Sequence, residues 1–434
     1  MGPLSLDQPW GRGFRPRHHH YFFDAAADAP AAPATPWLPR GLGRSYGDVC
    51  INDGGALLHT YRHDRLLAFD AASGILTAEA GASIADITAV FLPRGWFLPV
   101  VPGTRFVTLG GAVANDVHGK NHGSAGTFGC HVKGLRLRRS DCAGPFDLSP
   151  GDPLFAATVG GLGLTGLIET VSVRLERIPG PWIEQETQLF EGIAGYHALE
   201  DASADWPYTV GWIDTLDKRL RGVFFRGRHA ASAGDAPARP PAPRRIPPVG
   251  LPSILLGRMT ARAFNALYYR AQQAATAHRR QVSPYPFFWP LDALANWNRL
   301  YGRNGFLQYQ LVVPRPQAET TIEAILALFR REGLASYLAV IKRFGSVRSP
   351  GLLSFPLAGT TVALDIPAPD ARVHAVLDAA DALVVAAGGR LYPAKDARMK
   401  GTTFCAGYPN WERLEALRDP AVSSSFWRRV TRLS

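Results

Sequence analysis

The stretch PGTRFVTLGGAVANDVHGKNHGSAG, residues 102–126, decides the fold that the sequence predicts. It is rich in glycine and alanine, and it shows neither the alternation of a strand nor the three-to-four-residue spacing of a helix. Small residues beside polar ones are typical of a backbone that a large flat or elongated ligand approaches closely. We therefore expect residues 103–129 to form a loop or a backbone segment pressed against a ligand.

Two further glycine-rich segments lie on either side of this stretch. The segment RGLGRSYGD, residues 40–48, can present consecutive backbone N–H groups to a phosphate, although an ordinary surface turn would explain it equally well in isolation. The segment GLGLTG, residues 161–166, matches the G-x-G-x-x-G dinucleotide fingerprint, which requires a helix after its last glycine. Residues 166–175 instead alternate as a strand, so a Rossmann fold is disfavoured.

The remaining sequence predicts strands and helices in mixed order, which is an α+β pattern. Gln308 and Gln310 fall on one face of the strand expected over residues 306–313, because side chains alternate along a strand. Two amides on one face indicate a polar site rather than an ordinary core. Helices are also expected from Ile84 to Pro93 and over residues 321–329, and strands over residues 337–343 and 361–366.

The chain length and the net charge limit which classes of function are expected. A chain of 434 residues predicts two domains, and its formal net charge of +11 indicates an anionic partner, such as nucleic acid, a membrane surface or a phosphorylated ligand. No basic stripe interleaved with aromatic residues is present, so nucleic-acid binding is not expected. Trp10, Arg12 and Arg15 interrupt any secretory signal, and no segment has the roughly 18 apolar residues needed to cross a bilayer. We expect a cytoplasmic protein that can contact the membrane peripherally.

Metal binding is not expected. His118, His122, His131 and Cys130 carry side chains that zinc prefers, but the glycine-interrupted segment that holds them lacks the spacing of a knuckle or a helix face. The four cysteines show no C-x-x-C pair.

Several motifs together carry a family resemblance: residues 41–48, 102–129, 157–166, 305–310, 353–356 and 388–396. The chain resembles the flavoproteins of the vanillyl-alcohol oxidase type, and within them the enzymes that oxidise a lipid-linked pentose for cell-wall biogenesis. The resemblance implies a two-domain α+β fold with a discontinuous FAD-binding domain, residues 1–180 and 388–434. A substrate-binding domain with an antiparallel sheet, residues 181–387, would be inserted between them. Its Pro-rich stretch 229–252 is expected to be a mobile excursion.

The resemblance also implies which residues hold FAD, with the pyrophosphate on backbone N–H groups. Relatives that bind flavin covalently carry histidine where this chain has Arg44, so non-covalent FAD is expected. The implied FAD-binding residues are Gly41, Gly43, Arg44, Ser45, Tyr46, Gly47, Pro102, Gly103, Thr104, Thr108, Gly110, Gly111, Ala114, Asn115, Asp116, His118, Gly119, Asn121, His122, Ser124, Gly163, Gly166 and Ile168.

Catalysis is assigned by the same resemblance to Lys395, His118 and Tyr309. Lys395 can act as the base or can anchor a phosphate or the reduced flavin, and both roles stay open. A purely structural histidine is the alternative for His118.

The implied substrate residues are Gln308, Gln310, Lys342, Thr361 and Phe288, with a solvated lysine at the end of a strand as the alternative for Lys342. A relative in this branch carries asparagine in place of Thr361 and tyrosine in place of Phe288. It also carries, in place of Ala363, a cysteine beside the flavin, so capture by thiol-seeking inhibitors should fail here. The substrate pocket therefore differs more than the flavin site does.

The function implied is FAD-dependent oxidation of a sugar hydroxyl to a keto sugar. The expected hydroxyl is the 2′-OH of a polyprenyl-phosphoryl pentose such as decaprenylphosphoryl-β-D-ribose, and a separate NAD(P)H-dependent short-chain reductase would complete the epimerisation. An FAD-dependent oxidase of a free polyol or of an aldonolactone, such as D-arabinono-1,4-lactone, is the alternative on the same fold.

Overall fold

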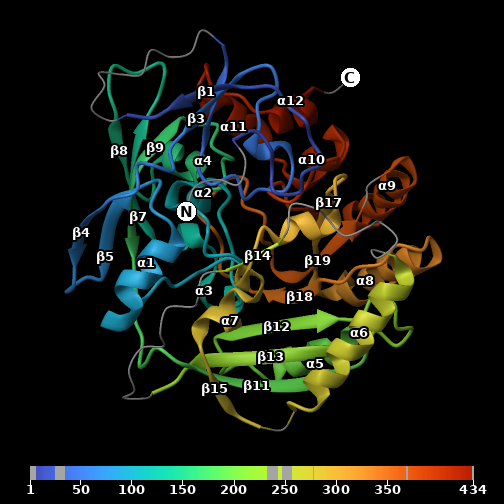
Figure 1. The fold of residues 1–434 in the computed structure, drawn as a ribbon. Coiled ribbons are helices and arrows are strands. Elements are labelled where there is room, and N and C mark those ends of the chain that lie inside the picture. The colour runs from blue at the N-terminus through green and yellow to red at the C-terminus, as the bar shows by residue number, and fades with distance from the viewer. Residues whose placement is uncertain are drawn as a thin grey trace.

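Three main β-sheets and the helices beside them make up the protein (Figure 1). The computed structural model describes residues 6–24, 35–231, 243–246, 257–276, 278–367 and 370–432. Strands and helices occur in mixed order along the chain, as the α+β prediction requires.

Two of the sheets come from the N-terminal part of the chain. A parallel sheet has the strand order β1 (His19–Phe22), β3 (Ala56–His59), β2 (Trp37–Arg40). An antiparallel sheet has the order β4 (Leu66–Asp70), β5 (Ile75–Glu79), β9 (Leu167–Arg174), β7 (Val132–Arg138), β8 (Phe146–Leu148). A short ribbon pairs β6 (Trp96–Phe97) with β10 (Glu176–Arg177), and the helices are α1 (Ile84–Phe91), α2 (Leu109–Ala114), α3 (His122–Ala125) and α4 (Pro153–Thr158).

The third sheet has eight strands, and all its pairings are antiparallel. Its order is β15 (Arg280–Val282), β11 (Ile183–Phe190), β13 (Gly222–His229), β12 (Tyr208–Ile213), β18 (Ala339–Phe344), β19 (Gly359–Pro367), β17 (Phe306–Pro314), β20 (Arg390–Leu391). The helices α5 (Gly192–Asp201), α8 (Arg315–Arg331) and α9 (Ala371–Ala386) pack their apolar side chains against one face. The helices α6 (Arg258–Gln273) and α7 (Pro284–Phe288) lie between β13 and β17 in the chain.

The period of two along β17 decides which of its side chains enter the helix-covered core. Leu307, Tyr309 and Leu311 belong to the large cluster that includes side chains of α8 and α9. Gln308 and Gln310 alternate with them and point to the opposite face, which has no such cover. The two amides that the sequence placed on one face therefore face the cavity described below.

Residues 103–129 contain more regular structure than the sequence predicts. Thr108 caps α2, because its hydroxyl oxygen accepts a hydrogen bond from the backbone N–H of Gly111 at 3.1 Å. The backbone N–H of Gly110 donates to the carbonyl of Ala80 at 2.8 Å, which presses this glycine-rich turn against the start of α1. A helix of six residues is too short for its period to show in the sequence.

The other expected elements form, with small shifts at their ends. The strand predicted over residues 166–175 is β9, and it follows residues 161–166 directly, so no helix N-terminus stands where a Rossmann fold needs one. The helix predicted over residues 321–329 is the centre of α8, and the helix predicted from Ile84 continues past Phe91 as one 3₁₀ turn.

The C-terminal helices return to the N-terminal sheets, as Figure 1 shows for α10 (Gly401–Gly407), α11 (Trp411–Leu417) and α12 (Ser425–Thr431). The backbone N–H of Trp37 donates to Ala421, and that of Ser425 donates to Ile51, each at 2.9 Å. The expected boundary at residue 387 does not separate the parts cleanly, because β20 follows it and yet extends the eight-stranded sheet. Of the Pro-rich stretch 229–252, residues 232–242 and 247–252 lie outside the described residues, and β14 (Arg244–Arg245) pairs with β16 (Leu294–Ala295).

Candidate active site

A cavity of about 700 Å³ is lined by residues from the N-terminal part of the chain and from the eight-stranded sheet. It falls within the range of about 300–1,000 Å³ that is usual for sites of small molecules and cofactors. Three segments far apart in the sequence contribute most of the FAD residues implied by the resemblance. Those that line the cavity are Gly41, Gly43, Arg44, Ser45, Tyr46, Pro102, Gly103, Thr104, Thr108, Gly110, Gly111, Ala114, Asn115, His118, Gly119, Gly163, Gly166 and Ile168.

Five of the implied FAD residues do not line the cavity: Gly47, Asp116, Asn121, His122 and Ser124. The buried Asp116 carboxylate accepts hydrogen bonds from the hydroxyls of Ser349 and Ser354, each at 2.5 Å. The Asn121 amide donates to the carbonyl of Pro99 at 2.6 Å, and His122 Nδ1 accepts from the backbone N–H of Gly345 at 3.1 Å. The family resemblance implied that these residues hold FAD, but the side chains of Asp116, Asn121 and His122 bond to the surrounding walls instead.

Gly47 is a case of close backbone approach. A Cβ at this position would lie 1.7 Å from the carbonyl oxygen of Asp396, and the neighbouring Tyr46 N–H donates to the carbonyl of Ala394 at 2.9 Å. The first glycine-rich loop is therefore packed directly against the loop that carries Lys395.

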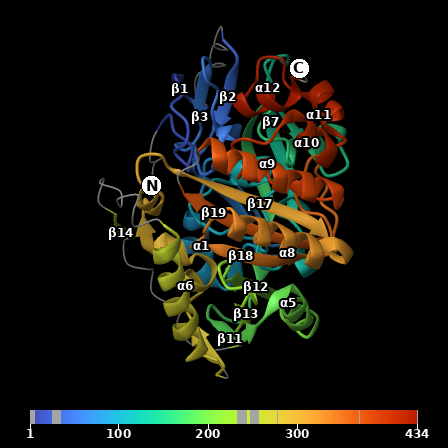
Figure 2. The same cartoon turned by 90° about the vertical axis from the view of Figure 1, so that its right-hand side faces the viewer.

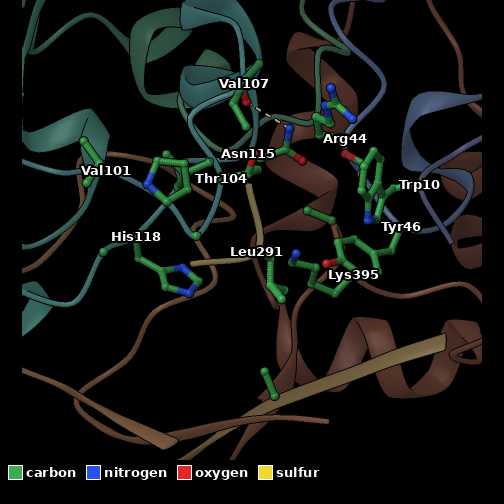
Figure 3. A pocket seen from close by; sticks show the side chains of 18 of the residues that line it. Trp10, Arg44, Tyr46, Val101, Thr104, Val107, Asn115, His118, Leu291 and Lys395 are labelled. Carbon is green, nitrogen blue, oxygen red and sulfur yellow. Dashed lines mark hydrogen bonds between the residues drawn. The ribbon is translucent and has the colours of Figure 1, made fainter. Parts of the chain in front are cut away.

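Arg44 occupies the position where covalent relatives have histidine. Its guanidinium lies 4.4 Å from the centre of the Trp10 ring, and its Nε donates to the carbonyl of Phe106 at 3.1 Å. Burial lowers the pKa of Arg44 to about 10, so the side chain is a cation at neutral pH and offers no nucleophile to a flavin. Figure 3 shows Arg44 and Trp10 at one end of the cavity.

His118 and Gln310 meet across the cavity wall. Gln310 Nε2 lies 3.1 Å from His118 Nε2, and it also lies 3.3 Å from the hydroxyl of Thr361. Burial, followed by the positive charges of Lys342, His122 and Lys395, holds the pKa of His118 well below its usual range. The ring is therefore neutral. Because His118 Nε2 accepts the hydrogen bond from Gln310, the ring proton lies on Nδ1. This Nδ1 atom is buried and has no partner among the described residues. Thr361, expected to contact substrate, does not line the cavity and supports Gln310 instead.

Lys395 lies over the ring of Tyr46, with Nζ 3.7 Å from the ring centre (Figure 3). Burial lowers the pKa of Lys395, whereas the buried carboxylate of Asp365 opposes that change. Gln308 Nε2 donates to Asp365 at 2.5 Å, and the Tyr301 hydroxyl donates to it at 3.3 Å. Lys395 is thus a half-buried amine whose charge is favoured by a carboxylate that two polar side chains hold in place.

Lys120 is a lining residue that the sequence reasoning missed, although it lies within the motif around His118. Its Nζ donates to the carbonyl of Phe288 at 3.1 Å. Burial and the charge of Lys342 lower the pKa of Lys120 to about 7, and burial lowers that of Lys342 to about 8. Neither lysine forms an ion pair with a carboxylate within the described part of the chain. The signal available in the sequence was a second lysine between glycine and histidine residues.

Tyr309 was expected to act in catalysis, and the structure contradicts this. Its hydroxyl donates to Asp381 of α9 at 3.0 Å, and the side chain is buried on the helix-covered face of β17. Because neighbouring residues of a strand point to opposite faces, Tyr309 faces away from the cavity that Gln308 and Gln310 line.

The cavity also extends along the eight-stranded sheet to α6, through residues that the sequence did not indicate. Phe288 lines this part, stacked on Phe97 with ring centres 5.2 Å apart, so the hydroxyl of a tyrosine is absent here. Further lining residues in this part are Val210, Trp212, Phe225, Tyr268, Gln272, Arg280 and Val282.

The lining fits a flavin cofactor. The glycine-rich turns expose backbone to the cavity, and the buried polar atoms Asn115 Oδ1 and His118 Nδ1 have no protein partner among the described residues. The histidines and cysteine considered for a metal are used otherwise: His131 Nε2 lies 2.9 Å from the carbonyl of Ala125, and within the described ranges no three His, Cys, Asp or Glu side chains form a metal-binding group.

Comparison with known proteins agrees with this lining. Residues 18–141 match the family described as FAD binding domain. The chain is 35% identical over 406 residues to decaprenylphosphoryl-β-D-ribose oxidase of Mycolicibacterium smegmatis, a match that covers 88% of this chain and 86% of that protein. It is 33% identical over 355 residues to a Streptomyces coelicolor protein described as "Uncharacterized protein in mprA 5′region", covering 77% of this chain and 95% of that one. The chain therefore belongs to the FAD-dependent oxidoreductases of the vanillyl-alcohol oxidase type that act on CH–OH groups.

Proposed function

We propose that this protein oxidises a ring hydroxyl of a polyprenyl-phosphoryl pentose, the 2′-OH of a decaprenylphosphoryl-ribose-like substrate, to a ketone. The similarity to a decaprenylphosphoryl-β-D-ribose oxidase supports a sugar substrate. The choice of a phosphorylated, lipid-linked sugar rests on the chemistry of the cavity.

Two half-buried lysines, Lys120 and Lys342, carry this proposal. Both line the cavity, and neither has a carboxylate partner in the described structure. Two partly desolvated ammonium groups that line one cavity without a carboxylate partner disfavour each other's charge, unless a ligand supplies negative charge. They come from the α2–α3 connection and from β18, not from the loop at residues 41–47 that is expected to hold the FAD pyrophosphate. A phosphate on the sugar substrate supplies the missing charge.

The oxidation removes a proton from the hydroxyl oxygen and a hydride from the adjacent carbon. FAD, when bound, supplies the hydride acceptor. Lys395 accepts the hydroxyl proton, because burial lowers its pKa and provides a neutral amine near neutral pH. Gln310 orients His118 so that the Nδ1–H of His118 can donate to a ligand oxygen. Gln308 holds the carboxylate of Asp365, whose charge acts on Lys395.

We also propose that FAD is held without a covalent bond and that a separate NAD(P)H-dependent reductase consumes the keto sugar. Arg44 supports the first point, because it replaces the histidine that forms the bond in relatives. The second is supported by the absence of a helix after residues 161–166, which leaves this glycine segment unable to bind a nicotinamide dinucleotide in the Rossmann manner. Acid precipitation of the purified protein should release all of its flavin into the supernatant.

A product assay tests the proposed substrate. The holoenzyme is given a short-chain polyprenyl-phosphoryl ribose, the matching phosphate-free alkyl riboside and an aldonolactone, each with an artificial electron acceptor. We expect turnover of the phosphorylated glycoside alone, with a product two mass units lighter that borodeuteride reduces to both epimers. Turnover of the free polyol or lactone, with none of the lipid phosphate, would replace this function by the alternative one.

A further inference from the structure

Acidic residues are scarce in one region of the chain. Residues 218–291 contain thirteen lysines or arginines and a single acidic residue, Asp235, a formal net charge of +12 against +11 for the whole chain. The rest of the protein is therefore almost neutral. Five of these arginines pair with carboxylates outside this region: Arg219, Arg221, Arg226, Arg228 and Arg279. The positive charge without such partners in the described structure therefore includes the arginines of one helix, Arg258, Arg262 and Arg270.

Helix α6 lies within this region and carries no acidic residue. Its inward face is anchored: Asn265 Nδ2 donates to Asp214 at 2.8 Å, and Tyr268 packs edge-on against Trp212 at 4.8 Å between ring centres. Figure 2 shows α6 along the outside of the molecule, away from the C-terminal helices. Much of its other face is exposed, although Phe264 packs edge-on against Tyr337 with 5.8 Å between ring centres.

The outward face of α6 combines large apolar side chains with arginines. Met259 is 86% exposed, Leu267 67% and Phe264 47%, and these are three of the eight large hydrophobic residues that the described structure exposes. Arg258, Arg262 and Arg270 are exposed on the same helix, and none of them pairs with a carboxylate of the described chain. With 100° per residue, Met259, Leu267 and Phe264 form a stripe that spans about 140° of the helix surface; Arg270 falls between Met259 and Leu267, and Arg262 and then Arg258 follow on the side of Met259.

A helix with this composition has the chemistry of an interfacial helix. Apolar side chains bury themselves at the boundary of headgroups and acyl chains, and flanking arginines bind anionic headgroups. Nucleic acid would use the arginines but would leave the apolar stripe in water. No helix among the described residues is long and apolar enough to cross a membrane.

The position of α6 relative to the cavity adds an independent observation. Tyr268 and Gln272 line the cavity from the inner side of α6, and the exposed Arg280 lines it just beyond the helix. The cavity therefore reaches the surface beside the same helix that exposes the apolar stripe. A long polyprenyl chain attached to the bound sugar would leave the cavity through such an opening.

We propose that α6 docks the protein on an anionic bilayer surface through Met259, Phe264 and Leu267 with Arg258, Arg262 and Arg270, so that the cavity opens toward the lipid. This docking proposal rests on the proposed function, because a lipid-linked substrate is the reason for the cavity to open at the membrane. Binding to vesicles needs no substrate, and it can therefore be tested separately from turnover.

The test is co-sedimentation of the FAD-loaded full chain with vesicles of phosphatidylcholine containing phosphatidylglycerol, and with vesicles of phosphatidylcholine alone. We expect wild-type protein to bind the anionic vesicles much more than the neutral ones. The double variant Met259→Glu/Leu267→Glu and the double variant Arg258→Glu/Arg262→Glu should each lower the partition coefficient at least about tenfold. Leu67→Glu, at an exposed leucine of β4, is the matched control and should bind like wild type.

Flavin absorbance and thermal unfolding of each variant show that it is folded. Wild-type protein that stays in the supernatant with anionic vesicles would overturn the docking proposal, as would α6 variants that bind like wild type. Loss of a concentration-dependent dimer in the α6 variants, without vesicle binding by wild type, would assign the stripe to an interface between copies. Turnover of detergent-dispersed lipid phosphate is measured in parallel, so failure of the proposed function appears there and not in sedimentation.

Discussion

Replacing Lys342 by methionine should separate recognition of a phosphate from the rest of the reaction. Methionine keeps a long apolar side chain in this half-buried position and removes only the charged donor. The Nζ of Lys342 has no carboxylate partner in the described structure, so a bound phosphate would be its main acceptor. A hydrogen bond to a charged group contributes about 1.5–3 kcal/mol, which corresponds to a loss of about 10- to 150-fold in kcat/KM for the phosphorylated substrate.

Lys120 should reduce the loss of kcat/KM that the Lys342→Met replacement causes. The charge of Lys342 lowers the pKa of Lys120, so removing Lys342 leaves Lys120 more fully protonated and still able to bind phosphate. The double variant Lys120→Met/Lys342→Met should therefore lose more activity than the product of the two single effects predicts.

The pKa of Lys120 is lowered to about 7 and that of Lys342 to about 8, and each lysine is cationic below its own value. Raising the pH from about 6.5 to 9 should lower wild-type kcat/KM for the phosphate substrate accordingly.

The assay is steady-state turnover of the lipid phosphate and of the matching phosphate-free riboside by holoenzyme variants. Lys218→Met, at an exposed lysine outside the cavity, is the control, and Lys342→Arg should retain much of the activity. The phosphate-free riboside should be used equally poorly by all variants. An equal loss on both substrates, or no loss with Lys342→Met, would refute the assignment of the lysine pair to phosphate.

Three further predictions concern the flavin site. Gly47→Ala places a Cβ 1.7 Å from the backbone of the facing loop and should destabilise the holoenzyme by about 1–3 kcal/mol or more with loss of bound flavin. Gly144→Ala, outside the cavity lining and with no atom within 4 Å of the added Cβ, is the control and should keep its flavin; equal flavin content in both variants would contradict this. Arg429→Met leaves the buried carboxylate of Asp48 unpaired and should lower the free energy of unfolding by about 3–5 kcal/mol in denaturant titration, with partial rescue by Asp48→Asn; an unchanged midpoint would disprove it. Ala363→Cys adds a thiol to the cavity lining, so intact-mass measurement should find one more alkylation than in wild type and fewer after substrate is added.

Much of the secondary structure followed from local patterns. The alternation at residues 166–175 and 306–313 predicted β9 and β17, and it also predicted that Gln308 and Gln310 share one face. These predictions hold because period-two side-chain geometry is a property of the strand itself. The short helix α2 was missed, because one turn and a half made of small residues shows no period.

The composition of the cavity depended on tertiary contacts. Sequence proximity to His118 could not tell that Lys120 faces the cavity while Asn121 and His122 bind backbone of the surrounding walls. Tyr309 was assigned to catalysis, although it alternates with Gln308 and Gln310 along the strand. Only the helices packed on one side of the sheet show that Tyr309 lies on the core face and the two glutamines on the cavity face.

The sequence by itself determined the family, the flavin cofactor and most of the segments that surround it, because glycine-rich turns leave a specific local pattern. Only the tertiary structure decided that Lys120 and Lys342 line one cavity without a carboxylate partner in the described structure, and that Gln310 holds His118. Charge pairing and burial depend on which distant strands become neighbours, and that information is absent from any single stretch of the chain.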